Sequence, residues 1–522
     1  MKDLADMPVG SAADTGAPKC ILIGAIDNVG SVHTHLMKQL KQNYGTRFII
    51  WGGGPAAWPD YAAAMTDDDA FVNPSFPAET GAATDAEVYR RAAAYEEKYG
   101  ITYMRDVIQM DRRYSGGFNP STYGSTRSLA VLPPLVRVYE EINQCFAWFE
   151  ALFEEKEVDG LILRPDYLHA APAIWIAVKR GIPVTFTSAA NYGTYVTWLC
   201  GPFMERGFVQ ERMSRTEPDR RLLEQQGSSS LVPGAAKRFF DEADRISTAG
   251  ELLRRIYTSS KNAAAHMVQD VLTGKLWKKS RRIPLWRSIE SHFRVFRIAR
   301  YLKGSSLATV EDVASGPYIL FLLQVEPEYS TLCLSREFSF TEAIIYQLAM
   351  CMPAGVRLVV KEHIPNIGNR PLDFYRRISR LPNVHMADYR LPGNELTEKA
   401  VAVSTISGSV GKQSTLIGKP AIIFAAHVDY SHMPNIRVVR SFHDLPEIMA
   451  WAVAPRDEAT TTSWRTEGAR LYGALTDISF DCPGIRLFGA SGKGDVLPEH
   501  QGRIMQTYLD LWHWQKRNGI PV

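Results

Sequence analysis

Short apolar runs typical of buried strands alternate along the first part of the chain with longer segments of helical periodicity. The first run, residues 19–27, is followed by a helical segment at 31–45 and a second apolar run at 47–54. This order is a β-α-β unit, which is typical of a parallel sheet. The further elements expected in this half are helices at 85–100, 133–156 and 169–181 and strands at 158–164 and 182–188.

The alternation stops near residue 207 and resumes near residue 316. The segment between is polar, mostly helical in pattern and without a clear strand. The second set of expected strands is 316–324, 355–363, 383–388, 401–406 and 421–427, with helices at 340–352, 371–381, 393–400 and 499–518. Strands that alternate with helices favour an α/β fold with helices on both faces of each sheet.

The pattern therefore predicts an α/β protein made of two Rossmann-like domains that face a central cleft, with a helical insertion between them. This is the GT-B arrangement of glycosyltransferases and sugar-nucleotide epimerases. The expected segments are an N-terminal, acceptor-side domain at 1–206, a helical basic connection at 207–310, a nucleotide-sugar-binding domain at 311–460 and a C-terminal extension at 461–522.

Composition narrows the class of protein. The chain has 522 residues, 45% apolar and 22% charged, with a net charge of +3, which is ordinary for a globular protein of two or more domains. Its six cysteines form no C-x-x-C pair, so neither a zinc site nor a disulfide framework is indicated. No apolar run reaches the roughly 18 residues of a spanning helix, and the polar start is unlike a signal peptide. We expect a cytoplasmic location.

Polar residues follow the expected strands of the second half, where ligands bind in open parallel sheets. A lysine, an imidazole and a glycine-rich loop at a helix start can together hold a phosphate. The strand-end candidates for holding a phosphate are Gln324, Lys361, Glu362, His363, Ser407, Gly408, Ser409 and Gly411. Taken singly, His363 is more often a structural histidine than a ligand.

Carboxylates at strand ends are the candidates for catalysis. Glu328 follows a strand of the second half, and Asp27 and Asp166 follow strands of the first half. A carboxylate at such a place can take a proton or stabilise a developing cation. The alternatives stay open, since Asp27 can cap a helix and Asp166 can form a turn after Pro165. The D-x-D sequence at Asp67–Asp69 is interpreted as surface, and no metal site or cofactor is expected.

The loop at 407–411 is not an ATP-binding P-loop. Gly411 and Lys412 are followed by Gln413, and Ile406 stands where that motif requires its first glycine. The remaining pattern is a strand, a loop of small residues and a helix. It fits either a plain β-to-α turn or a loop that holds the phosphate of a nucleotide sugar.

Three stretches, 321–332, 359–388 and 395–424, resemble the C-terminal half of bacterial capsule and surface-polysaccharide biosynthesis proteins, a GT-B group that includes retaining Kdo transferases. The resemblance covers about Pro317 to Tyr430. The matching residues are Gln324, Pro327, Glu328, Ser330, Thr331, Lys361, Glu362, His363, Ser407, Gly408, Ser409, Val410 and Gly411. The chain departs from the motifs at Ile364, which displaces a proline, and at Gln413-Ser414, which replace Glu-Ala.

The resemblance implies a glycosyltransferase of surface-polysaccharide biosynthesis. It implies a CMP- or UDP-linked sugar donor, with CMP-Kdo as one candidate, and a glycan or glycolipid acceptor. It also implies that the strand-end candidates above, together with Gln413, bind the nucleotide sugar. Two alternatives remain at this stage: a sugar-nucleotide epimerase on the same fold, and a non-catalytic capsule-assembly protein. The change at Gln413 is compatible with the second of these.

A basic stretch at 275–304 carries ten lysines and arginines and a single acid, Glu290, with aromatic residues between them. Ile289, Phe293 and Phe296 have helical spacing, with Arg300 one turn further. Such a segment suits anionic lipid at the inner membrane face, and the membrane-surface candidates are Lys278, Lys279, Arg281 and Arg282. The competing interpretation is an interdomain helix that packs its aromatics on the first half. No nucleic-acid partner is expected.

Overall fold

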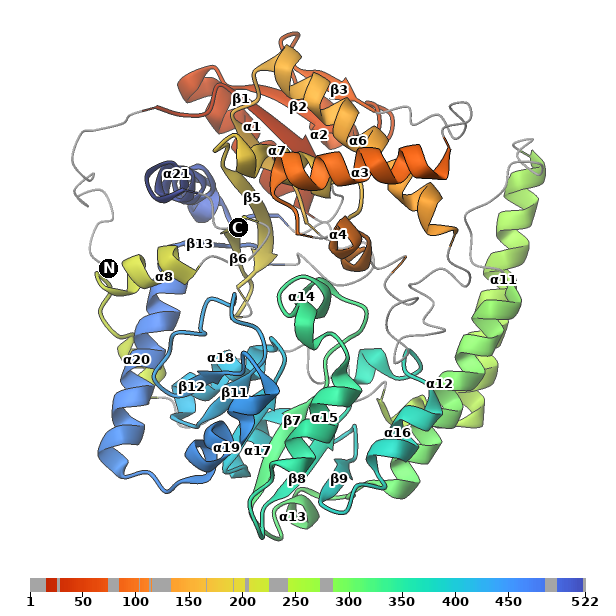
Figure 1. Ribbon diagram of the computed structural model, residues 1–522, viewed down its shortest axis with the longest axis vertical. Coiled ribbons are helices and arrows are strands. Elements are labelled where there is room, and N and C mark those ends of the chain that lie inside the picture. The colour runs from red at the N-terminus through yellow and green to blue at the C-terminus, as the bar shows by residue number, and fades with distance from the viewer. Residues whose placement is uncertain are drawn as a thin grey trace.

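The computed structural model describes residues 16–25, 29–73, 84–102, 104–111, 114, 133–165, 167–190, 192–201, 206–224, 243–272, 285–483 and 495–519. Two α/β domains lie one above the other, and a long helical pair runs along one side (Figure 1). The predicted fold class, two Rossmann-like domains in a GT-B-like arrangement, is confirmed by the two sheets described below.

The N-terminal domain is built on a seven-stranded sheet of order β13-β6-β5-β4-β1-β2-β3. Its five strands from β5 to β3 are parallel, and β6 and β13 extend one edge in antiparallel pairs. The strands are β1 (Cys20–Gly24), β2 (Arg47–Trp51), β3 (Ala70–Val72), β4 (Gly160–Ile162), β5 (Val184–Ala189), β6 (Tyr195–Cys200) and β13 (Ser479–Asp481). Every residue of β1 and β4 is buried, as expected for strands covered on both faces.

Helices cover both faces of this sheet. One face packs against α3 (Asp85–Tyr99), α4 (Met104–Met110), α6 (Leu135–Lys156) and α7 (Ala171–Lys179). The other packs against α1 (Gly30–Tyr44), α2 (Pro59–Ala62) and α21 (Gln501–Asn518). The last helix of the chain therefore belongs to the N-terminal core.

The C-terminal domain has a six-stranded, fully parallel sheet of order β12-β11-β10-β7-β8-β9. The strands are β7 (Tyr318–Leu322), β8 (Arg357–Lys361), β9 (Val384–Ala387), β10 (Ala402–Thr405), β11 (Ala421–Ile423) and β12 (Ile436–Val438). Read from β9, this is the 3-2-1-4-5-6 order of the dinucleotide-binding fold, which reverses direction between β7 and β10.

Helices again form a layer on each side. One face packs against α12 (Leu285–Ser305), α15 (Thr341–Met350), α16 (Leu372–Ile378) and α19 (Leu445–Val453). The other packs against α13 (Val310–Val313), α14 (Tyr329–Leu332), α18 (Ser409–Ile417) and α20 (Glu458–Asp477), with α17 (Gly393–Lys399) beside them.

The chain crosses between the domains more than once. After α20 it returns to the N-terminal sheet, where β13 pairs with β6 and α21 packs on α1 and β6. One hydrophobic core is shared, because Met110, Phe186, Val209 and Met213 lie in a cluster with residues of the C-terminal domain. The short helices α8 (Arg206–Met213) and α9 (Arg220–Glu224) pack against α20 on the same side.

The helical part of the connection forms a pair, α11 (Ala249–Leu272) and α12. The base of the pair is anchored on the C-terminal domain, where Ile298, Ala299 and Leu302 of α12 are buried in its core. This differs from the predicted alternative of a helix packed on the first half. Among the described residues, no helix is long and apolar enough to cross a bilayer.

The D-x-D sequence agrees only in part with its interpretation as surface, because Asp67 and Asp68 are exposed but the side chain of Asp69 is not. The Asp69 carboxylate is fully buried and accepts hydrogen bonds from the Phe48 and Thr66 amides, at 2.7 and 2.8 Å, and pairs with Lys41. Because Phe48 lies on β2 and Lys41 on α1, Asp69 joins a strand, a helix and its own loop. Its role in the fold is structural.

Candidate functional site

The carboxyl edge of the C-terminal sheet brings the predicted strand-end loops together at the point where the strand order reverses. Gln324 follows β7 and Ser407 follows β10, and these strands are direct neighbours. Open α/β sheets bind ligands in the crevice that such a reversal leaves between two loops.

The Gln324 side chain joins the two loops. Its Oε1 accepts from the Ser407 amide at 3.0 Å, and its Nε2 lies 3.2 Å from the Ser407 hydroxyl. The Ser407 hydroxyl donates to the Ser330 carbonyl at 2.8 Å. Gln324 therefore acts here as a brace for the glycine-rich loop.

The loop ends at the start of α18, with Gly408 as the N-cap residue and Ser409 as the first helical residue. The first N–H groups of a helix have no acceptor within it and, with the helix dipole, favour an anion. A Cβ on Gly408 would lie 2.6 Å from the Thr405 hydroxyl, and one on Gly411 would lie 2.7 Å from the Tyr430 ring. Only glycine fits at both places, one in the turn before α18 and one in its first turn.

Tyr430 supports the loop from below. Its hydroxyl donates to the Gly408 carbonyl at 2.7 Å, and burial raises the pKa of this phenol well above its usual value. The phenol therefore stays a proton donor at any physiological pH. Tyr430 lies at the end of the region of resemblance, where nothing in the sequence pattern had singled it out.

A buried arginine links the loops after β7 and β8. Arg370 donates to both oxygens of Glu362 at 2.8 and 2.9 Å and to the Gln324 carbonyl at 2.8 Å, and it lies 3.3 Å from Glu326. None of its side chain is exposed to solvent. Burial by itself lowers the pKa of Arg370, but the charges of Glu326 and Glu362 raise it by a larger amount. The pKa is therefore above its usual value, and the guanidinium stays charged.

The Glu362 side chain is buried below the carboxyl edge of the C-terminal sheet and does not face the solvent. Its carboxylate is occupied by Arg370, by the Tyr375 hydroxyl at 2.6 Å and by the His363 amide at 2.7 Å. We therefore reassign Glu362 from a direct ligand contact to a positioning group, because its oxygens already have donors within the protein.

Lys361 is also turned inward. Its ammonium group donates to the carbonyls of Tyr389 at 3.1 Å and Glu362 at 3.4 Å. Burial lowers its pKa to about 8, although Glu362 and Asp388 partly oppose this. Lys361 thus supplies positive potential below the loops, and its side chain does not reach the surface of the site.

His363 is the exposed member of its motif. Its ring lies at the carboxyl end of β8, and the surrounding protein, followed by the charge of Lys361, lowers the pKa to about 4. The imidazole is therefore neutral at pH 7 and can donate one hydrogen bond to a ligand oxygen.

Glu328 lies next to the contact between the domains. It is the half-buried N-cap residue of α14, and its carbonyl accepts from the Thr331 and Leu332 amides. The neighbouring Tyr329 packs edge-on against Phe186 of the N-terminal domain, with ring centroids 5.5 Å apart. The other catalytic candidates, Asp27 and Asp166, lie outside the described residues, as do Lys278, Lys279, Arg281 and Arg282. Asp27 and Asp166 follow β1 and β4, the pair at which the N-terminal sheet reverses its order.

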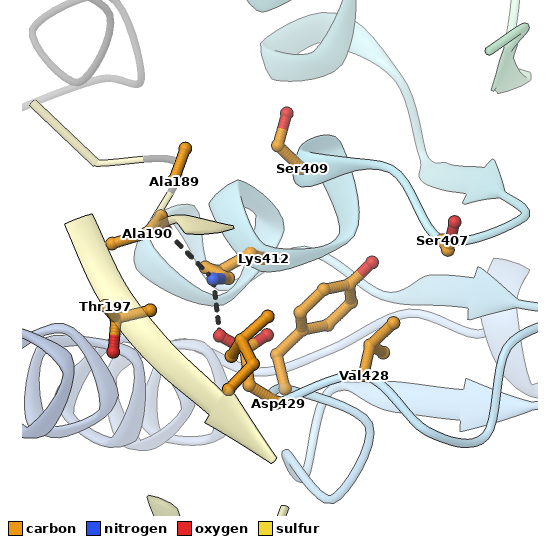
Figure 2. A pocket seen from close by; sticks show the side chains of 10 residues that line it. Ala189, Ala190, Thr197, Ser407, Ser409, Lys412, Val428 and Asp429 are labelled. Carbon is orange, nitrogen blue, oxygen red and sulfur yellow. Dashed lines mark hydrogen bonds and ion pairs between the residues drawn. The ribbon is translucent and has the colours of Figure 1, made fainter. Parts of the chain in front are cut away.

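A small cavity of about 30 Å³ lies between the domains at the start of α18. Ala189, Ala190, Thr197 and Leu199 line it from the N-terminal domain, and Ser407, Ser409, Lys412, Val428, Asp429 and Tyr430 line it from the C-terminal domain. Figure 2 shows Lys412 directed to Asp429 and to the Ala190 carbonyl, at 2.5 and 3.1 Å, with Ser409 at the start of the helix above them. Lys412 is therefore engaged in holding the domains together.

Sequence reasoning missed the groups that support the site. Arg370 and Tyr430 contact the loops from positions that are far away in the chain. The Lys412–Asp429 pair joins α18 to the N-terminal domain. Gln413 is half-buried on α18. In the described part of the chain, no group of three histidine, cysteine or acidic side chains could hold a metal ion.

Comparisons with known proteins give distant likenesses only. No protein-family model and no curated protein matches the chain. Among solved structures, a β-Kdo 2,7 transferase, KpsC of Thermosulfurimonas dismutans, is 13% identical, covering 69% of this chain and 88% of its own with a TM-score of 0.31. The UDP-GlcNAc 2-epimerase of Neisseria meningitidis is 10% identical, covering 88% and 98% with a TM-score of 0.28. S. aureus MnaA, solved with UDP, is 10% identical, covering 88% and 94% with a TM-score of 0.27. At these values the likenesses carry no argument about the function.

Proposed function

We propose that this protein is a glycosyltransferase that binds a nucleotide-sugar donor at the carboxyl edge of its C-terminal sheet. The observation that carries the proposal is the meeting of the β7 and β10 loops at the start of α18, braced by Gln324. A fold of this strand order, with a free helix start at its reversal point, is suited to a nucleotide phosphate.

The donor phosphate would lie against Ser409 and the first N–H groups of α18, on the loop that Ser407 holds in place through Gln324 and Ser330. The neutral His363 ring would donate one hydrogen bond, and the buried Lys361 charge would add positive potential from below. The helix start and the His363 ring would stabilise the leaving phosphate through fixed dipoles, and Lys361 would stabilise it through its positive charge. Gln413 stands where the resembling family has an acid, so we expect recognition of the ribose or base to differ from that family.

The reaction breaks the bond between the anomeric carbon and the phosphate oxygen of the donor. A new bond forms between that carbon and an acceptor hydroxyl oxygen, and the acceptor's proton passes to a carboxylate. Glu328, Asp27 and Asp166 are the candidates, either for this base or for a nucleophile in a retaining reaction.

The finer assignment rests on the resemblance of the motifs. We propose a role in bacterial surface-polysaccharide biosynthesis, with a CMP- or UDP-linked donor such as CMP-Kdo and a glycan or glycolipid acceptor. A glycolipid acceptor would require the protein to work in the cytoplasm at the inner face of the membrane.

The test of the donor site is calorimetric titration with CMP, CDP, UMP, UDP and ADP. We expect one pyrimidine nucleotide to bind, and His363→Ala and Ser409→Ala each to weaken it by about 1–3 kcal/mol, because each removes a partner of the phosphate. His443→Ala, which changes a histidine of the distant η7 turn (Phe442–Asp444), is the matched control. Normal affinity in both site variants would place the nucleotide elsewhere.

The test of the reaction class is the fate of the bound donor. A transferase slowly releases free nucleotide in the absence of acceptor, an epimerase changes the sugar and keeps the nucleotide attached, and a non-catalytic protein does neither. With a turnover assay in hand, Glu328→Gln, Asp27→Asn and Asp166→Asn identify the carboxylate that chemistry requires. Unchanged turnover in all three would remove these carboxylates from the mechanism.

A further inference from the structure

The pair of helices α11 and α12 carries apolar side chains that the fold leaves uncovered. Those of α11 include Leu253, Tyr257, Met267 and Val268, and those of α12 include Leu285, Trp286 and Phe293. Apart from Leu285, which is 38% exposed, these residues are between 47% and 69% exposed. Figure 1 shows α11 running along the outside of both domains. So many exposed large apolar residues on one element mark an interaction surface.

The apolar residues form a stripe on each helix. At about 100° per residue, Leu253, Tyr257 and Met267 fall on one side of α11, and Trp286 and Phe293 fall on one side of α12. The helices contact each other through another side, where the Ser259 hydroxyl lies 2.8 Å from His292 and 3.2 Å from Ser288.

Both stripes face the same side of the pair. On a helical projection of α11, the stripe is rotated by about 80–160° about the helix axis from Ser259, the residue that contacts α12. On a projection of α12, the stripe is rotated by about 100–160° from the contact residues Ser288 and His292. The two offsets have the same sense along the chain. In an antiparallel pair, this brings both stripes to one common surface, which we call the hairpin face.

The sequence that contains both helices is strongly positive, and eight of its cations lie in the described residues of α11 and α12. Residues 249–305 contain thirteen lysines and arginines and three acids, a net charge of +10, although the whole chain has only +3. The remainder of the chain is therefore net negative, at −7. Arg297 and Arg300 continue the α12 stripe, and the Arg300 guanidinium stacks over Phe296 at 5.7 Å.

We propose that the hairpin face docks on an anionic lipid bilayer. Aromatic and aliphatic side chains that enter the interface, combined with arginines that pair with lipid phosphates, are the features of a helix that lies on a membrane. Nucleic acid would use the charge but leave the apolar stripe uncovered. The docking stands on this surface alone and does not depend on the proposed reaction.

The first test is co-sedimentation of the full-length protein with vesicles of phosphatidylcholine containing one-third phosphatidylglycerol. We expect binding at low salt that weakens at least tenfold in vesicles of pure phosphatidylcholine and that falls steadily with added salt. Absence of binding to the anionic vesicles at low salt overturns the proposal.

The second test changes the face itself. Leu253→Ser, Tyr257→Ser, Trp286→Ser and Phe293→Ser together should reduce vesicle affinity at least tenfold, because they remove the inserted surface. The matched control is Tyr44→Ser with Met350→Ser, two side chains of similar exposure, 48% and 70%, outside the pair. An equal loss in the control, or no loss in the quadruple variant, overturns the proposal.

The third test separates lipid from other partners. Arg297→Glu with Arg300→Glu should abolish the preference for anionic vesicles, whereas Arg440→Glu, an exposed arginine elsewhere, should not. Two results would assign the face differently and overturn the lipid proposal: a dimer in solution that the quadruple variant dissociates, or tight duplex DNA binding that the serine substitutions leave intact. Nucleotide affinity, measured in parallel, reports on the proposed reaction separately.

Discussion

Arg370 carries a charge at a place where its side chain has no contact with solvent, held between the carboxylates of Glu326 and Glu362. Its replacement by methionine leaves two buried acids without their cation. We expect Arg370→Met to lower the stability of the C-terminal domain by about 3–5 kcal/mol, as when one partner of a buried ion pair is removed. Chemical denaturation measures this.

The control for Arg370 is the exposed pair formed by Arg376 and Asp373, 3.1 Å apart. Arg376→Met should cost less than about 1 kcal/mol. Arg370→Lys restores the charge without the fork that reaches both Glu362 and the Gln324 carbonyl. If this variant regains stability but not nucleotide affinity, Arg370 positions the site as well as holding the fold; recovery of both would leave it a purely structural role.

His33 is a buried histidine that burial keeps neutral, with its pKa lowered to about 3. Its Nδ1 lies 2.7 Å from the Tyr61 hydroxyl, and its ring stacks on Trp198. The unfolded chain binds a proton at this histidine below about pH 6.5 and the folded chain does not, so folding stability falls as the pH drops from 6.5 towards 3.

The His33→Phe variant lacks this titration. Between pH 6 and 4 we expect its free energy of unfolding to fall less steeply with decreasing pH than that of the wild type. The difference between the two slopes should be about 1.4 kcal/mol per pH unit. The pH slope of the free energy of unfolding is the measurement, since the lost hydrogen bond to Tyr61 affects all pH values alike. Parallel slopes would show that His33 takes up its proton in the folded state too.

At the scale of elements, α18 depends on glycine where Tyr430 presses against it. A Cβ at Gly411 would lie 2.7 Å from the aromatic ring, whereas one at Gly502 in α21 meets nothing within 4 Å. We expect Gly411→Ala to destabilise the protein by about 1–3 kcal/mol and to weaken nucleotide binding, because α18 must shift. Gly502→Ala should instead stabilise by about 0.5–1 kcal/mol.

Tyr430→Leu tests the cause of the Gly411 effect. If the ring is responsible, the double variant should be less destabilised than the sum of the two single variants, with a coupling of about 1 kcal/mol. Additive effects would place the strain elsewhere. Thermal melting of the four proteins is sufficient.

The strands and helices that the sequence predicted are those with the strongest patterns. The runs that became β1, β7, β8 and β10 are continuous and apolar, and each is present at nearly the predicted bounds. The strands β3, β12 and β13 have three residues each and lie at sheet edges, where they are only partly buried, whereas β4 and β11 are equally short but fully buried and were predicted. The strand β6 was missed because it pairs antiparallel with both β5 and β13 and so stands outside the alternation of strand and helix on which the prediction relied.

The sequence predicted which loops form the candidate site. It did not predict what each side chain in those loops does. A strand end tells where Gln324, His363 and Ser407 lie, because parallel strands end at one edge. It does not tell whether a side chain such as that of Lys361 or Glu362 points out of the edge or beneath it. That depends on partners such as Arg370, Tyr375 and Tyr389, which only the folded chain brings close.

At the scale of the whole molecule, β13 and α21 complete the core of the N-terminal domain, although about 280 residues separate β13 from β6. Trp198 of β6 contacts Phe480 of β13 and Tyr508 of α21, and the Trp198 indole donates to the Ile504 carbonyl. A chain ended at Asp477 loses these partners and exposes the part of one face of the N-terminal sheet that α21 covers. We expect it to aggregate or to be rapidly cleaved between residues 16 and 201.

The control for this truncation is a chain that ends after Asn518, which keeps β13 and α21. Limited proteolysis with mass spectrometry compares the two proteins with the full chain. In the shorter protein the C-terminal sheet, β7 to β12, should remain protected, because all its strands precede residue 439. A stable, protease-resistant N-terminal domain in that protein would contradict the dependence.

The return of the chain also sets an order of events during synthesis. A ribosome makes β1 to β6 first, but β13 and α21 emerge only after the whole of the C-terminal sheet has been translated. At about 5–20 residues per second, the N-terminal sheet remains for on the order of tens of seconds with one edge unpaired and one face only partly covered. The domain made second can therefore finish folding first, and the nascent N-terminal half is the part of this protein for which chaperones have the longest time to act.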